Sequence, residues 1–176
     1  IDEEAKEIIG SVKVLQDEVI YKLIENLVIY RKEKSKEIEK KRLMGLSTIC
    51  KLKILHQYVF RSTKPAIFGV KVDGGRLISR LYLIDEQGEK VGQVKNIQSE
   101  NKSVEEAHEG MEVAISIPGE NYERHLKTKN FLYSDMSGTQ FRNFKKNKDL
   151  LSGREMQILQ EIAEIKRKIN PENWYD

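Results

Sequence analysis

The sequence predicts an α+β fold, in which a long solvated N-terminal helix leads to a closed antiparallel β-barrel that carries two C-terminal helices. Two observations predict it. Apolar residues recur first at helical spacing, then alternate in short runs after Leu46, and return to helical spacing after Leu132. Turn residues separate the alternating runs about every ten residues, as in antiparallel barrels. The expected boundaries are 17–44 for the connecting helix, 45–132 for the barrel and 133–176 for the helix pair.

The composition favours a domain with more surface than a compact protein of this size. Of the 176 residues, 39% are hydrophobic and 34% are charged. The net charge is only +3, so affinity for nucleic acid has to come from local patches. The single cysteine, Cys50, excludes an internal disulfide and fits a reducing compartment. No apolar run approaches the ~18 residues of a membrane span, and the first residues lack signal-peptide features, so a cytoplasmic protein without a membrane partner is expected.

The N-terminal segment, residues 1–16, contains a short alternating stretch around Val12 and Val14. A strand this short has no partner within reach. It is either a frayed tag or the remaining edge of a preceding α/β domain.

The connecting helix is expected to begin at Glu18, because Asp17 is placed to cap it. Over residues 31–42 only Ile38 is apolar, yet the lack of Gly and Pro predicts that the helix continues. A helix that is polar all round is typical of a solvated bridge between domains. The alternative is a basic arm that grips phosphates, which the interleaved glutamates disfavour. The first half carries an apolar stripe made of Val19, Ile20, Leu23, Ile24, Leu27 and Val28.

At least five short alternating runs predict the strands of the barrel. They are CKLKILHQYVF, AIFGVKV, RLISRLYLI, KVGQVKNIQ and MEVAISI. Asp73-Gly74-Gly75 is predicted to be a hairpin turn, Gly88 lies in a second turn, and Pro118-Gly119 ends the last run. Alternation in the first run places on one face Cys50, Leu52, Ile54 and Tyr58.

Two serines are placed to cap the C-terminal helices. Ser137 precedes TQFRNFKKNK and Ser152 precedes GREMQILQEIAEIKRKI, which Pro171 is expected to end. Both helices are amphipathic and should therefore dock on the barrel. The apolar side of the second helix is expected to contain Met156, Leu159, Ile162, Ala163 and either Ile165 or Lys166.

Catalytic and metal-binding patterns are lacking in the sequence. There is no phosphate-binding GxxxxGK[ST] loop and no zinc-ligand spacing. Cys50 and His56 would lie about 20 Å apart along one strand, which favours a buried core cysteine over a nucleophile. His108 is interpreted as a solvated turn residue. An enzyme acting through His56, His108 or His125 is the least favoured hypothesis, because none has a partner at catalytic spacing.

Two polar segments remain as candidate binding sites. The loop YERH, residues 122–125, lies beside the basic KTK at 127–129 and suits phosphate or carboxylate capture, although it could be an ordinary polar loop. A basic run near the C-terminal helices could receive an acidic peptide with apolar anchors, or could be a solvated helix face. This run consists of Arg142, Lys145, Lys146, Lys148 and Arg154, with Phe141, Phe144 and Met156 nearby.

Several segments, in order, resemble the C-terminal part of archaeal and eukaryotic translation initiation factor five-B, the relative of bacterial initiation factor two. They are VIYKLIENL, PAIFGVKVDGGRL, the run from Ile97 to GMEVAISI, and PGENYERHL. The resemblance covers about residues 12–169 and implies that 1–16 end the family's third domain and that 46–176 form its fourth. It also implies that GTP and magnesium belong to the rest of the full-length protein. No cofactor, metal or catalytic residue is therefore expected in this chain.

The resemblance implies three partners: initiator methionyl-tRNA, the acidic C-terminal tail of initiation factor one-A, and the ribosomal subunits. The short terminus looks archaeal. The acceptor end of the tRNA would be bound near Gln98, Ser99, Glu100, Asn101, Lys102, Met111, Glu112, Val113 and Ala114, with Lys102 near a phosphate. The tail would be bound by Arg124, His125, Phe141, Arg142, Lys145, Lys146, Arg154, Met156 and Leu159.

Two departures from the family pattern affect these expectations. Ser79-Arg80 follows the GRL segment where the family has a small residue or Gly, and Glu155-Met156 replaces an Asp-Trp in the helix pair. The local strand geometry and the packing of the tail groove are therefore open. The alternative function is a purely structural or protein-interaction barrel on a helical stalk, without nucleic-acid binding.

Overall fold

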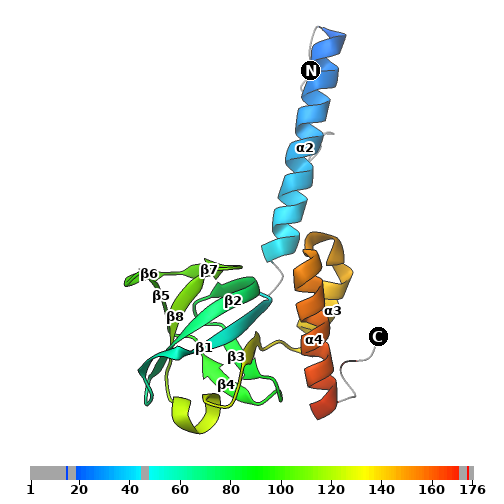
Figure 1. Cartoon of the computed structure of the whole chain (residues 1–176). Coiled ribbons are helices and arrows are strands. Elements are labelled where there is room, and N and C mark those ends of the chain that lie inside the picture. Colours follow the sequence, from blue (N-terminus) through cyan, green and yellow to red (C-terminus); the bar gives the residue numbers. More distant parts are fainter. Residues whose placement is uncertain (1–14, 16–18, 45–47, 171–173, 175–176) are drawn as a thin grey trace. The chain divides into compact units, whose positions relative to one another are not determined.

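The computed structural model describes residue 15 and residues 19–44, 48–170 and 174. The chain divides into two compact units, residues 1–45 and 46–176. Figure 1 labels most of the elements. In chain order they are α2 (Ile20–Met44), β1 (Cys50–Arg61), β2 (Ala66–Ile78), β3 (Tyr82–Asp85), β4 (Lys90–Gln93), β5 (Asn96–Ser99), β6 (Lys102–Val104), β7 (Glu106–His108), β8 (Glu112–Ile117), the π-helix η1 (Tyr122–Leu126), β9 (Phe131–Ser134), α3 (Gly138–Lys146), the 3-10 turn η2 (Lys148–Leu150) and α4 (Gly153–Ile169).

The described part of the first unit is the 25-residue helix α2. Most of its predicted apolar stripe is exposed, from Leu27 at 40% to Ile20 at 68%. The proposed cap at Asp17 and the short strand around Val12 and Val14 lie outside the described residues. The solvated bridge stays a prediction. Across the described residues, no helix has the length and apolar character that crossing a membrane requires.

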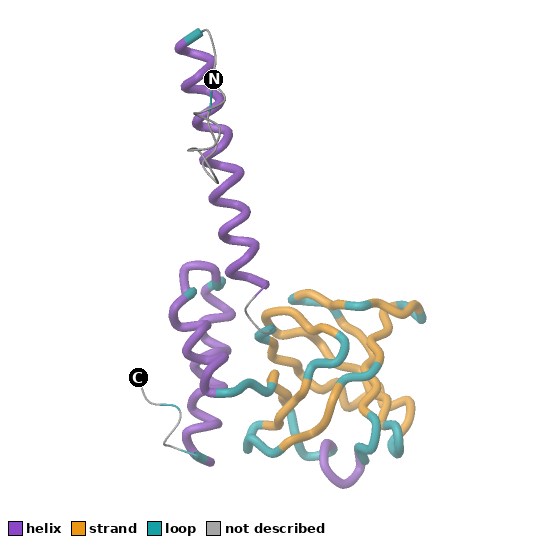
Figure 2. Tube along the Cα trace, turned by 180° about the vertical axis from the view of Figure 1, so that it is seen from behind, coloured by secondary structure: helices purple, strands orange, loops and turns teal. Residues whose placement is uncertain are grey.

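The second unit is built on a nine-stranded antiparallel sheet that curls on itself (Figures 1 and 2). Its strand order is β4-β3-β9-β1-β2-β8-β5-β6, and β7 pairs with the last residues of β2. The hydrogen-bonded path ends at β4 on one side and at β6 on the other. The α+β class and the antiparallel pairing are confirmed, whereas closure of the barrel stays a prediction.

Two apolar clusters hold this unit together. The first fills the inside of the curled sheet and includes Leu52, Phe68 and Ile115, all fully buried. The second lies between the C-terminal helices and strands β3 and β9, where Ile84 and Tyr133 meet Ile158 and its neighbours. Each fully buried Leu, Ile or Phe side chain contributes about 1.5–3 kcal/mol.

The two C-terminal helices begin at the predicted serines. The Ser137 hydroxyl accepts from the Gln140 backbone N–H, and the Gln140 side chain accepts from Ser137 N–H at 2.7 Å. Ser152 and Glu155 form the same reciprocal pair at the start of α4. These capping boxes satisfy donors that a helix start leaves unpaired. The buried side of α4 includes Ile158, whereas Met156, expected there, is only half-buried.

The predicted hairpin turn at Asp73-Gly74-Gly75 is wrong. Strand β2 continues through these residues, and Gly75 pairs with Cys50 of β1. A shift in the β1–β2 register lies beside this segment, and Gly75 has a φ of 75°. A Cβ at Gly75 would lie 2.1 Å from the backbone oxygen of Ile49, so the glycine permits close packing of neighbouring backbone. The segment is an irregular, bent part of a strand and not its end.

Two other predicted strands are each divided in the structure. RLISRLYLI ends β2 at Ile78 and begins β3 at Tyr82, with Arg80 at a φ of 65° in the turn between them. KVGQVKNIQ separates into β4 and β5, which pair with β3 and β8 respectively. Strands β6 and β7 were not expected, and His108, predicted in a turn, is an exposed residue of β7. Period-two patterns do not reveal a change of pairing partner, so sequence reasoning merged these strands.

Candidate functional site

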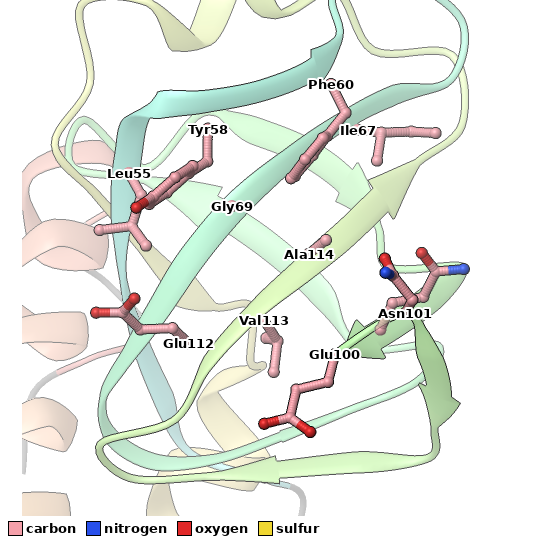
Figure 3. A pocket seen from close by; sticks show the side chains of 11 residues that line it. Leu55, Tyr58, Phe60, Ile67, Gly69, Glu100, Asn101, Glu112, Val113 and Ala114 are labelled. Carbon is pink, nitrogen blue, oxygen red and sulfur yellow. The ribbon is translucent and has the colours of Figure 1, made fainter.

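A pocket of about 400 Å³ opens on the face of the sheet opposite its apolar core (Figure 3). Its residues come from β1, β2, β8 and the β5–β6 hairpin. Most of them alternate along the strands with core residues, whereas Val113 belongs to the apolar core as well. We call it the aromatic–acidic pocket. It is lined by Leu55, Tyr58, Phe60, Ile67, Gly69, Gln98, Glu100, Asn101, Glu112, Val113 and Ala114.

A bulge in β1 brings the aromatic residues to the pocket. Leu55 pairs with Gly69, but the next pair joins Val59 to Phe68, so three residues of β1 have no partner on β2. Such an insertion bends the strand and reverses which face a residue occupies. Tyr58 is therefore 49% exposed, and its predicted place on the core face with Cys50 is wrong.

One hydrogen bond holds the bulge from the other side. The Nδ1 atom of His56 lies 2.6 Å from the phenolic oxygen of Tyr122, in the π-helix η1. The Tyr122 ring is buried against Phe68, and burial raises the pKa of its phenol. His56 thus connects the bulge to a buried residue of the core.

Small residues form the floor of the pocket. Gly69 and Ala114 face each other across β2 and β8. A Cβ added at Gly69 would lie 2.9 Å from the Cβ of Tyr58, closer than ordinary packing allows. The depth of the pocket therefore depends on glycine at this position.

The charge of the pocket is negative. In Figure 3 the rings of Tyr58 and Phe60 lie toward the top of the view and the carboxylates of Glu100 and Glu112 toward the bottom, with Gly69 and Ala114 between them. None of the described residues that line it is cationic. Glu100 and its neighbour Asn101 have φ values of 51° and 62°, as in the tight two-residue turn that joins β5 to β6.

The structure brings together most of the residues predicted to bind tRNA. Gln98, Glu100, Asn101, Glu112, Val113 and Ala114 all line the pocket. The three others lie outside its lining. Ser99 is half-buried at the end of β5, Lys102 is exposed on β6, and Met111 is half-buried against the core.

Sequence reasoning missed the contribution of β1 and β2, namely Leu55, Phe60 and Ile67. Phe60 is 67% exposed, which is unusual for a large aromatic side chain in a strand. The sequence signal was a second aromatic residue two positions after Tyr58. Which face of the sheet Phe60 occupies depends on the bulge in β1, and the alternating pattern of the sequence did not indicate that bulge.

The residues predicted to bind a partner tail are spread over two hollows and the core of the helix pair. Phe141 and Leu159 are 5% and 4% exposed inside the helix-pair core, so they present almost no surface to a partner. Arg154 bonds to Asp73 of β2 at 2.5 Å. Lys145 lies over the Phe141 ring, while Lys146 is exposed and Met156 is half-buried on the same helix pair.

Arg124 and His125 lie in η1, which β9 separates from the helix pair along the chain. They line a hollow of about 320 Å³ together with the buried carboxylates of Asp85 and Glu120. His125 Nδ1 lies 2.5 Å from Glu120 Oε1, and Lys129 pairs with Asp85 at 2.6 Å. His125 and Lys129 therefore already have carboxylate partners within the chain.

A second large hollow, of about 480 Å³, lies between the β3–β4 turn and the C-terminal helices. We call it the helix-side hollow. Arg142 is the residue of the predicted tail set that lines it, together with Gly88, Lys90, Ser137, Gly138, Thr139, Lys166, Ile169, Asn170 and Trp174. Lys166 pairs with Asp135 at 2.5 Å, and the Trp174 ring packs on Phe141.

Two observations concern candidate metal ligands and the thiol in the described part of the chain. It contains no group of three or more His, Cys, Asp or Glu side chains arranged to hold a metal ion. Cys50 is fully buried, and burial raises the pKa of its thiol to about 12. The buried core cysteine predicted from the sequence matches this environment.

Comparison with known proteins identifies the family. A family model described as elongation factor Tu domain 4 matches residues 49–133. A probable translation initiation factor IF-2 from Methanoculleus marisnigri is 35% identical over 97% of this chain and 29% of its own length. The corresponding protein of Ignicoccus hospitalis is 40% identical over 96% of this chain and 28% of its own length.

Among solved structures, GDP-bound aIF5B from Aeropyrum pernix matches 99% of this chain and 30% of its own, with a TM-score of 0.73 and 35% identity. The chain thus spans between 28% and 30% of the length of these relatives. The resemblance seen in the sequence is confirmed at this level. The chain belongs to the archaeal IF-2/aIF5B family of translation initiation factors, of which it represents a segment.

Proposed function

We propose that the aromatic–acidic pocket receives the aminoacylated 3′ end of initiator tRNA during translation initiation. The observation that carries the proposal is the combination of two exposed aromatic rings with two carboxylates and no cation in the described lining. Family membership supports a role in initiation, and the chemistry of the pocket supports this ligand.

Each part of an unformylated methionyl-adenosine end has a matching group in the pocket. The rings of Tyr58 and Phe60 suit stacking of the terminal base, which contributes about 1–3 kcal/mol per base. The carboxylates of Glu100 and Glu112 suit the positively charged α-amine. Apolar side chains at Leu55 and Ile67 suit the methionyl side chain.

Calorimetric titration with methionyl-adenosine joined by a stable amide tests this proposal. We expect the chain to bind it, and we expect an N-acetylated analogue to bind at least several-fold more weakly because it lacks the charge. Glu112→Gln should remove most of this preference. Glu164→Gln, at an exposed position of α4, is the matched control and should leave it intact. Equal binding of both analogues would contradict the role of the carboxylates.

We further propose that the helix-side hollow docks the acidic C-terminal tail of initiation factor one-A. Its lining combines the cations Lys90 and Arg142 with the exposed apolar side chain of Ile169, which suits an acidic peptide with an apolar anchor. Arg142→Glu should abolish binding of a synthetic tail peptide. Lys168→Glu, an exposed change on α4 outside the hollow, should not. The opposite result would remove this assignment.

We infer that this segment is not itself catalytic, and that GTP and magnesium are bound elsewhere in the full-length protein. In this proposal the full-length protein acts in the cytoplasm with the ribosomal subunits, and α2 serves as the solvated connector to the rest of the molecule. The exposed, highly charged course of α2 supports that role. The alternative is a structural or protein-interaction domain without nucleic-acid binding. Failure of the chain to bind either aminoacyl-adenosine or charged initiator tRNA would favour it.

A further inference from the structure

We propose that two cations beside the aromatic–acidic pocket, Lys95 and Arg80, bind the phosphates of the RNA strand that leads to the aminoacylated end. We call these two residues and the hollows that they line the cationic track. This inference rests on the proposed function, because it assigns the path of the same ligand outside the pocket.

The track is continuous with the pocket. A hollow of about 180 Å³ shares Ile67, Gln98 and Ala114 with the pocket and continues to Lys95 and Asn96. Asn96 precedes Gln98 by two residues on β5, a step of about 7 Å along one face of the strand. A ligand anchored at Gln98 can therefore reach Asn96 without leaving the sheet surface.

A third hollow extends the path further. It has a volume of about 550 Å³, shares Lys95 and Asn96 with the second hollow, and adds Arg80 and Pro118. The three hollows thus follow one another from the bulge of β1, across β8 and β5, to the turn before β3. Their shared residues make them one surface.

Charge changes sign along this surface. The pocket has Glu100 and Glu112 and no cation in its described lining, whereas the described linings of the other two hollows contain cations and no carboxylate. Lys95 and Arg80 are both exposed. Among the described residues, neither side chain has a carboxylate within ion-pair distance, in contrast to Lys51, Lys129 and Arg154.

The backbone beneath both cations is fixed. The Arg80 N–H donates to the Val94 carbonyl at 2.8 Å, and the Gln93 side chain donates to the Arg80 carbonyl at 2.9 Å. The Lys95 N–H donates to the Ser116 carbonyl at 2.8 Å. These bonds position two side chains that remain available to a ligand, so binding costs little further conformational entropy of the backbone.

The ligand has the same order of charges. An aminoacylated RNA end carries a positive amine at its tip and negative phosphates behind it. The surface offers carboxylates at the pocket and cations behind it, so only one direction of the strand satisfies both. An acidic peptide would match the track but would be repelled by the pocket.

Affinity measurements with two ligands test the track. One ligand is phosphate-free methionyl-adenosine with an amide link, and the other is charged initiator methionyl-tRNA, each titrated over a salt series. The variant is Lys95→Gln with Arg80→Asn, because Asn tolerates the positive φ of residue 80. Lys168→Gln, on the exposed face of α4, is the control.

We expect the double variant to bind tRNA at least 10-fold more weakly at low salt, with the slope of log affinity against log salt reduced by about 1.5. Binding of methionyl-adenosine should be unchanged. If tRNA affinity and slope stay at wild-type values while both ligands bind, the track is wrong and the proposed function stands. If the wild-type chain binds neither ligand, the proposed function fails and the track with it. A polyglutamate peptide that binds the wild type more tightly than tRNA and is lost in the double variant would also overturn the RNA assignment.

Discussion

The Nδ1 atom of His56 lies 2.6 Å from the hydroxyl oxygen of Tyr122, although 66 residues separate them in the chain. This contact joins the bulge of β1 to the π-helix η1. The bulge carries Tyr58 to the aromatic–acidic pocket, so the hydrogen bond links a buried part of the core to the proposed binding surface.

Tyr122→Phe tests that link, because it removes the hydroxyl and keeps the ring that packs 5.3 Å from Phe68. We expect the free energy of unfolding to fall by about 0.5–1.5 kcal/mol, the usual net value of one hydrogen bond. A urea denaturation series measures the loss. His56→Ala combined with Tyr122→Phe should cost less than the sum of the two single changes. Strict additivity would mean that the contact contributes nothing.

Gly69→Ala is expected to displace Tyr58, because the new Cβ would lie 2.9 Å from the Cβ of that residue. Overpacking of this kind typically lowers the free energy of unfolding by about 1–3 kcal/mol, and here it should also weaken binding of methionyl-adenosine. Calorimetry and urea denaturation measure the two effects. Gly153→Ala is the control, since no heavy atom lies within 4 Å of its added Cβ. Unchanged ligand affinity in Gly69→Ala would show that the bulge adapts.

Arg154→Ala is expected to loosen α4 from the sheet. The Arg154 side chain bonds to the carboxylate of Asp73 at 2.5 Å and donates to its carbonyl at 3.3 Å. Because both side chains are about a third exposed, we expect a loss of only about 1 kcal/mol in urea denaturation. Lys127→Ala, which removes a more exposed pair with Glu123, should lose less. If Arg154→Ala instead loses tail-peptide binding at unchanged stability, Arg154 contacts the tail as the sequence predicts.

Cys50 is expected to make the free energy of unfolding depend on pH in the alkaline range. Burial raises the pKa of its thiol to about 12, whereas an unfolded cysteine has a pKa of about 8.5. Between these values the unfolded state binds fewer protons than the folded state. The free energy of unfolding should therefore fall as pH rises, by up to about 1.4 kcal/mol per pH unit from this group.

Denaturation of the wild type and of Cys50→Ala between pH 8 and 11 measures this contribution. We expect a shallower decline in the variant, whatever its absolute stability. Tyr133, whose pKa is also raised by burial, is present in both proteins and cancels in the comparison. Parallel curves would show that the Cys50 thiol ionises equally easily in both states.

The sequence by itself determined the elements that depend on near neighbours. The capping boxes at Ser137 and Ser152 involve residues three positions apart, so their chemistry is visible in the sequence and both helix starts were predicted. Alternation placed Cys50, Leu52 and Ile54 on the buried face correctly, because the register shift between Lys51 and Leu52 puts its extra residue in β2 and leaves the alternation of β1 intact. The family resemblance also brought Gln98, Glu100, Asn101 and Glu112 together before any geometry was known.

Tertiary structure alone decided where regular patterns break. The bulge that turns Tyr58 outward is held by a contact with Tyr122, and the bend at Asp73-Gly74-Gly75 is shaped by close packing against Ile49 and α4. Neither cause lies within reach of a local pattern, since each joins segments far apart in the chain. The shape of the pocket follows from the first of these breaks, because a strand without a bulge would have turned the aromatic side chain of Tyr58 toward the core.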